Sequence, residues 1–120
     1  MIYKNNSQIS DTLNFDINIS DDFSISDLYN FPNPMKTETN FIFKIDAADN
    51  SGNSIVKIYT TSGKIIREIK YPLSAGINQI AWDGKDSDGD FIANGTYLYK
   101  LIIDNESKTE SKVQKLVVLR

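Results

Sequence analysis

Short apolar runs separated by turn-forming residues recur along this chain, and they constrain its fold more than any other feature. The runs, which are rich in β-branched and aromatic residues, lie at 13–19, 41–45, 54–60, 64–69, 77–82, 96–103 and 112–119. Glycine, proline, asparagine and aspartate gather between them, at the spacing of about 8–12 residues that is typical of a β-sandwich or barrel. No window has the period and length of a helix. The sequence therefore predicts an all-β fold, an antiparallel sandwich of seven or eight strands.

Alternation within the run at 96–103 predicts which of its side chains are buried. It places Tyr97, Tyr99, Leu101 and Ile103 on one face and Lys100 on the other. We expect the tyrosine face to belong to the core, and an exposed aromatic platform for carbohydrate is the alternative. The dipeptide at 62–63 lies between two β-branched runs and predicts a hairpin turn with glycine at positive φ.

Two residue types are missing, and their absence limits the chemistry of the chain. Its 120 residues include no histidine and no cysteine. This excludes Ser-His-Asp and Cys-His catalysis, zinc sites of the usual kind and disulfide bonds. Only a pair of carboxylates, or a metal ion held by oxygen ligands, would remain for catalysis.

Charge and hydropathy exclude two classes of partner. The net charge is -3 and the pI is about 4.8, and the lysines are scattered among acids, so we expect no nucleic-acid partner. No apolar run approaches the roughly 18 residues that a membrane span needs. The first residues lack the apolar core of a signal peptide, so we expect that, if the parent protein is exported, the chain is a fragment of it.

The first 27 residues differ in character from the remainder. They are rich in serine, aspartate and asparagine, and they contain one convincing strand pattern, at 13–19. We expect residues 1–27 to be a spacer that can add an edge strand, and residues 28–120 to be the domain itself. Pro32 and Pro34 donate no backbone hydrogen bond, which suits a lead-in or an edge strand.

Four aspartates within residues 83–90 raise the question of a calcium site. They are Asp83, Asp86, Asp88 and Asp90, and carboxylate oxygens are the ligands that calcium prefers. An EF-hand is excluded, because with Gly89 at the sixth position of the loop the first and twelfth positions fall on Gly84 and Gly95. A looser calcium turn stays open. The Asp-Gly pairs favour a plain turn, closed by aspartates that accept bonds from backbone amides two residues on.

Motifs in a fixed order make the chain resemble a known family. They are NFPNP at 30–34, VKIYTTSGKIIREI at 56–69, LSAGINQIAWDGKDSDGDFIANGTYLYKL at 73–101 and QKLVVLR at 114–120. Together they resemble the immunoglobulin-like C-terminal domain that Bacteroidetes use as a sorting signal for the type IX secretion system. The Trp-Asp-Gly and Asn-Gly-Thr-Tyr motifs are shared with the immunoglobulin-like domain of flagellar hook-capping proteins. The Pro-Asn-Pro lead-in and the C-terminal position are more similar to the sorting domains.

The resemblance implies a non-catalytic immunoglobulin-like domain of an exported protein, found at the outer-membrane surface or outside the cell. Its partners would be secretion-machinery proteins of the outer membrane. It implies no cofactor, and calcium in the aspartate loop is the alternative. The parent would be a cargo protein or the sortase itself, a gingipain-like cysteine peptidase. A structural assembly module like the hook cap, and a calcium- or carbohydrate-binding adhesion module, remain as alternatives.

Two groups of residues match the motifs of the family. The fold-forming group is Pro32, Asn33, Pro34, Gly63, Trp82, Asp83, Gly84, Gly95 and Tyr97. The recognition group is the last strand, with Lys115, Leu116, Val117, Val118, Leu119 and Arg120. An end strand can pair with the sheet edge of a receptor, and we expect it to be removable with the fold largely intact. Completion of this sandwich is the equal alternative for that strand.

Overall fold

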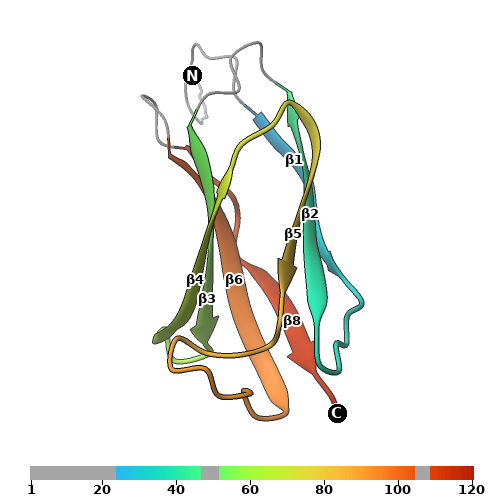
Figure 1. The fold of residues 1–120 in the computed structure, drawn as a ribbon, viewed down its shortest axis with the longest axis vertical. Coiled ribbons are helices and arrows are strands. Elements are labelled where there is room, and N and C mark those ends of the chain that lie inside the picture. Colours follow the sequence, from blue (N-terminus) through green and yellow to red (C-terminus); the bar gives the residue numbers. More distant parts are fainter. Residues whose placement is uncertain (1–23, 47–51, 105–108) are drawn as a thin grey trace, which may run out of the picture.

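The computed structural model describes residues 24–46, 52–104 and 109–120, which form two antiparallel sheets packed face to face (Figure 1). The strands are β1 (Ser24–Phe31), β2 (Thr39–Asp46), β3 (Asn53–Thr60), β4 (Ile65–Pro72), β5 (Gly76–Trp82), β6 (Gly95–Asp104), β7 (Thr109–Glu110) and β8 (Gln114–Val118). The predicted all-β sandwich is confirmed. The strand expected at 13–19 lies outside the described residues.

The strand order places the last strand at one side of the larger sheet. The smaller sheet has the order β1-β2-β5, and the larger sheet has the order β4-β3-β6. β7 and β8 both pair with the side of β6 that faces away from β3.

In the described part of the chain, no helix is long and apolar enough to span a membrane.

A bulge explains why the sequence patterns do not predict β1 as a strand. Asp27 has a φ of 59°, and the pairing of β1 with β2 shifts register between Ser26 and Tyr29. The extra residue breaks the alternation of side chains on which strand prediction depends. β1 extends across the expected boundary between residues 27 and 28, so the residues from Ser24 onward belong to the sheet.

The core lies between the sheets and is built by alternation in both of them. Buried residues alternate with more exposed ones in β3 and β5. Phe41 of the smaller sheet lies between Trp82, at 6.1 Å between ring centroids, and Tyr99 of the larger sheet, at 4.8 Å. Trp82 and Tyr99 are 2% and 1% exposed, and Tyr97 packs partly buried against the same core. The expectation that the tyrosine face of residues 96–103 is core is therefore confirmed.

The hairpin between β3 and β4 also follows the prediction. Gly63 has a φ of 95°, a conformation that glycine adopts without steric cost. Its N–H donates to the Thr60 carbonyl at 2.9 Å, and the Thr60 N–H donates to the Lys64 carbonyl at 2.9 Å. The turn thereby brings β4 back along β3.

Candidate functional site

The last strand is part of the sandwich, and only some of its side chains are available to a partner. Leu116 and Val118 lie in the core at 0% and 1% exposure, and the strand pairs with β6. Lys115 and Leu119 are exposed and Val117 is half-buried. The expectation that the strand can be removed with the fold largely intact is wrong, because removal would take two core side chains with it. A role of these residues in recognition stays a prediction.

The outer edge of β8, which faces away from β6, is covered by the Pro-Asn-Pro segment. The Met35 N–H donates to the Val117 carbonyl and the Met35 carbonyl accepts from the Leu119 N–H, both at 2.8 Å. One step earlier, the Asn33 carboxamide repeats this pattern: Nδ2 donates to the Lys115 carbonyl at 3.4 Å and Oδ1 accepts from the Val117 N–H at 3.0 Å. Asn33 and Met35 thus form two rungs of a parallel ladder, one of them from a side chain. We call these two residues, with their bonds to β8, the clasp.

Buried polar groups hold the clasp against the smaller sheet. Thr39 Oγ1 donates to the Pro32 carbonyl at 2.9 Å, and Asn30 Nδ2 donates to Thr39 Oγ1 at 3.3 Å. Asn33 Nδ2 in turn donates to Asn30 Oδ1 at 3.3 Å. Asn30 and Thr39 are 5% and 1% exposed, so these bonds satisfy groups that water does not reach.

The structure brings together two groups that the sequence analysis kept apart. Pro32, Asn33 and Pro34 were assigned to the fold and the last strand to recognition, yet Asn33 bonds to Val117, 84 residues further along the chain. This contact was not predicted from the sequence. The available signal was an asparagine between two prolines, which donate no backbone hydrogen bond, so that within the tripeptide only Asn33 has N–H donors.

The aspartate loop is a turn closed by two of its four carboxylates. Asp83 Oδ1 accepts from the Lys85 N–H at 3.1 Å, and Asp86 Oδ1 accepts from the amides of Asp88 and Asp90 at 2.9 and 3.0 Å. The prediction that aspartates here accept bonds from amides two residues on is confirmed. Among the residues that the structure describes, no group of three or more acidic side chains is arranged to hold a metal ion.

The carbonyl of Lys85 fastens this loop to the core and to β4. It accepts from Trp82 Nε1 at 2.9 Å and from Arg67 at 2.8 Å, and Arg67 also donates to Asp83 at 3.2 Å. Desolvation alone would raise the pKa of Asp83, but the Lys85 amide and the Arg67 charge outweigh it and lower that pKa below its usual 3.8. Asp83 is therefore a structural acceptor that stays ionised at neutral pH.

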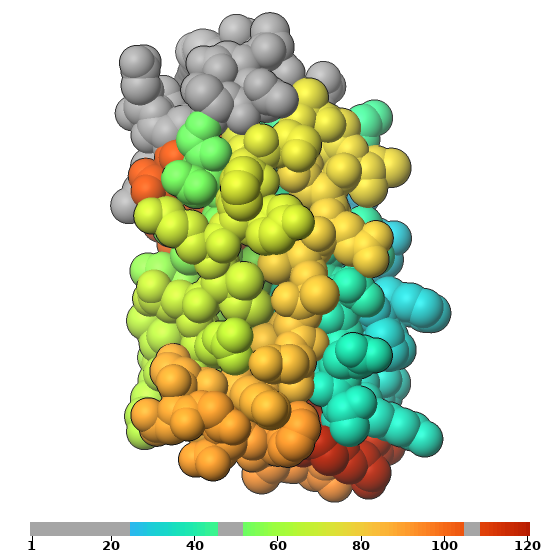
Figure 2. Space-filling view, in the orientation of Figure 1, coloured from blue at the N-terminus to red at the C-terminus, as the bar shows by residue number. Residues whose placement is uncertain are grey.

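Arg120 docks on the same loop. Its N–H donates to Asn94 Oδ1 at 3.0 Å, and its guanidinium donates to the Ile92 carbonyl. The guanidinium also lies 5.1 Å from the Phe91 ring centre, and the Lys85 ammonium lies 5.0 Å from it, at cation–π distance. Figure 2 accordingly shows the loop in orange and the chain end in red at the same end of the molecule.

The other residues assigned to the fold lie around this loop. Gly84 has a φ of 74°, and a Cβ added there would lie 2.7 Å from the Thr37 carbonyl oxygen, so only glycine fits. The Tyr97 hydroxyl donates to the Ala93 carbonyl at 2.7 Å. Gly95 begins β6. Each of these positions shapes the turn or the strand in which it lies.

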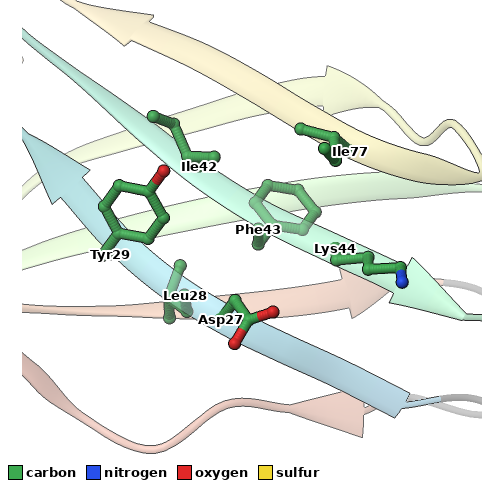
Figure 3. Close-up of a pocket in the computed structure, with 7 residues that line it drawn as sticks. All are labelled: Asp27, Leu28, Tyr29, Ile42, Phe43, Lys44 and Ile77. Carbon is green, nitrogen blue, oxygen red and sulfur yellow. The ribbon is translucent and has the colours of Figure 1, made fainter.

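A second surface feature lies on the outer face of the smaller sheet, at the β1 bulge (Figure 3). It is a hollow of about 520 Å³. The residues that line it are mostly apolar, and they are Asp27, Leu28, Tyr29, Ile42, Phe43, Lys44 and Ile77. Tyr29 and Ile77 are 49% and 75% exposed. The hollow could not be predicted from the sequence patterns, because it depends on β1, a strand that they do not indicate.

Three solved structures that are similar to this chain come from two kinds of protein. Dimeric latent PorU from Porphyromonas gingivalis is similar with a TM-score of 0.72 and 25% identity, over 88% of this chain and 10% of that chain. FlgD from Xanthomonas campestris, reported for hook capping in flagellar assembly, has a TM-score of 0.53 and 21% identity, over 79% of this chain and 66% of that chain. FlgD from P. aeruginosa has a TM-score of 0.48 and 28% identity, over 56% of this chain and 51% of that chain. No curated protein matches the chain.

The chain spans a tenth of the PorU chain and between half and two thirds of the FlgD chains. A family model supplies the assignment. The model of the FlgD Ig-like domain matches residues 33–107, a range that begins at Asn33 and contains the Trp82-Asp83-Gly84 motif and β6. Because this range is more than half of the chain, the chain belongs to the family of FlgD Ig-like domains.

Proposed function

We propose that this chain is a non-catalytic domain that directs or anchors an exported protein through the type IX secretion system, by contacts with machinery proteins of the outer membrane. Its place would be the cell surface or the medium. The proposal covers both a cargo protein and the sortase as parent. The residues that would carry recognition are the outward side chains Lys115 and Val117 of β8 and Leu119, which follows directly after the strand.

The observation that carries this proposal is the extent of the likeness to PorU. It covers 88% of the chain, which is more than the range 33–107 that the FlgD Ig-like model matches. The likeness to PorU therefore takes in residues outside the range of the FlgD Ig-like model, and its TM-score of 0.72 exceeds the 0.53 of FlgD from X. campestris. The clasp joins β8 to Asn33, at the start of the shared range. The ordered motifs, from NFPNP to QKLVVLR, support the same function.

An export assay tests the proposal. The chain is fused behind a signal peptide and a fluorescent protein, in a bacterium with the type IX machinery. We expect fluorescence at the surface or in the medium, and its loss when the machinery is disabled. Fluorescence that stays in the periplasm of a competent strain would contradict the proposal.

Substitution separates recognition from folding better than deletion does. Lys115→Glu with Leu119→Ser changes exposed side chains of the last strand and leaves Leu116 and Val118 in the core. The matched control is Lys70→Glu with Ile65→Ser, two exposed positions on β4 at the other edge of the same sheet. We expect the first pair to lose export and the control to keep it, with equal melting temperatures.

The family assignment favours a second candidate, a structural assembly module. The matched model is named for FlgD, and one similar FlgD structure is reported for hook capping. Such a module would assemble into rings or filaments. Sedimentation at high protein concentration tests this, and a strictly monomeric profile would argue against it.

A further inference from the structure

Four of the backbone groups that residues 115–119 direct away from β6 are bonded to the clasp. They are the Lys115 and Val117 carbonyls and the Val117 and Leu119 N–H groups. A partner that recognises this strand by strand addition needs those same groups. Strand addition and the clasp therefore exclude one another.

We propose that the outer edge of β8 is a binding site for an extended peptide strand running parallel to it, and that the clasp keeps the site closed in the free domain. The segment of the chain that already lies there indicates this occupant, because Met35 pairs with β8 in the parallel sense. The inference rests on the proposed function to the extent that a recognising partner supplies the strand.

The Asn33 rung is the displaceable part of the clasp, because Met35 is 0% exposed and lies in the core. The side-chain rung of Asn33 is exposed, and its two bonds measure 3.4 and 3.0 Å, so water can replace them at small cost. Pro32 and Pro34 have no N–H, and the segment therefore cannot extend its own ladder. A continuous peptide strand supplies an N–H and a carbonyl at each step, so it can form the same rungs and further ones.

There is also space beyond the clasp for a longer strand. A hollow of about 330 Å³ lies between β1 and the segment that leads into β8. Its lining comes from Ile25, Asp27 and Leu28 on one side and from residues 109–112 and Gln114 on the other. A strand that displaces Asn33 can therefore continue along the edge towards Val113, whose side chain is 58% exposed.

Amide hydrogen exchange on the purified chain tests whether the clasp closes the edge. In Asn33→Ala we expect the Val117 amide to exchange about two- to tenfold faster, the range set by the loss of one net hydrogen bond. The Val118 amide should be unchanged, because Val118 pairs with β6. The control is Asn94→Ala, which removes an equally exposed asparagine bond of 3.0 Å to the Arg120 amide, away from the edge, and should leave Val117 unchanged.

A conservative variant and a peptide test the site itself. Asn33→Asp keeps the acceptor for the Val117 N–H but loses the Nδ2 bonds to the Lys115 carbonyl and to Asn30, so Val117 exchange should rise less than in Asn33→Ala. A soluble blocked peptide of alternating valine and threonine, titrated by NMR, should bind Asn33→Ala at least tenfold more tightly than the parent chain, with shifts at Lys115 and Val117.

Unchanged Val117 exchange in Asn33→Ala would overturn the closing role of the clasp. Faster exchange without tighter peptide binding would overturn the strand site. Both readouts use the purified domain and do not depend on export. A failed export assay therefore leaves them standing, and their failure leaves the export proposal standing.

Discussion

Replacing Trp82 by alanine tests whether one side chain serves both the core and the aspartate loop. The ring is 2% exposed and stacks on Phe41, so truncation should cost about 3–5 kcal/mol of unfolding free energy through the cavity it leaves. Loss of the bond from Nε1 to the Lys85 carbonyl should add about 1 kcal/mol. The sum approaches the total stability of a small domain, which is about 5–15 kcal/mol.

Trp82→Phe separates the two contributions. It keeps most of the apolar ring and removes only the N–H donor, so we expect a cost of about 1–3 kcal/mol. The Lys85 carbonyl would then be held by Arg67 alone. Because one of its two bonds is lost, the aspartate loop should loosen locally, and the Asp88 and Asp90 amides should exchange faster.

Urea unfolding followed by far-UV circular dichroism is the suitable assay, because Trp82 is the single tryptophan and its fluorescence disappears in both variants. The slope of free energy against urea should stay constant if only the folded state has changed. A loss below about 1 kcal/mol in Trp82→Ala would refute the core assignment. Equal losses in both variants would show that the hydrogen bond outweighs the packing.

Three further predictions concern single positions. Gly84→Ala should cost at least about 1 kcal/mol more unfolding free energy than Gly89→Ala in urea unfolding. Both glycines have positive φ, but only at Gly84 would an added Cβ lie 2.7 Å from a backbone oxygen, and equal costs would contradict this. Asp86→Ala should lower the unfolding free energy by about 0.5–1.5 kcal/mol and Asp88→Ala by less than about 0.5, because Asp86 accepts two amide bonds. If millimolar calcium instead raises the melting temperature of the parent chain, the loop is a metal site. Burial raises the pKa of Tyr99 from 10.0 to about 12, so the folded state favours the neutral phenol and stability is lost as the pH rises from 10 towards 12, by roughly 2–3 kcal/mol. The unfolding free energy of the parent chain should therefore fall relative to that of Tyr99→Phe over that range, and parallel curves would refute the shift.

Most of the fold could be predicted from local pattern. Alternation in residues 54–60 and 77–82 marked β3 and β5, and the glycine at 63 marked the hairpin, because these signals depend only on near neighbours. β1 was missed because the bulge at Asp27 shifts the alternation within the strand. A bulge is set by how two strands twist against each other, and a single strand does not reveal it.

The candidate site was less predictable, because its parts are distant in the sequence. The terminal strand was found as a run of apolar residues, but the inward orientation of Leu116 and Val118 required knowledge of its pairing with β6. The role of Asn33 depends on a contact 84 residues away. The aspartate loop was the exception, since the bonds of Asp86 span only two and four residues and local turn chemistry was sufficient.

The direction of the strands has a mechanical consequence. The start of β1 and the C-terminus lie towards opposite ends of the long axis (Figure 1), and the segment at Met35 runs parallel to β8. Tension applied between a load attached before β1 and an anchor that holds the last residues would act along the strands. It would then strain the β1–β2, β6–β8 and Met35–β8 bonds in shear, all at once and not one after another. Forced unfolding is governed by the unfolding rate, so we expect the domain to unfold more slowly under this loading than under a load that peels the strands apart one bond at a time.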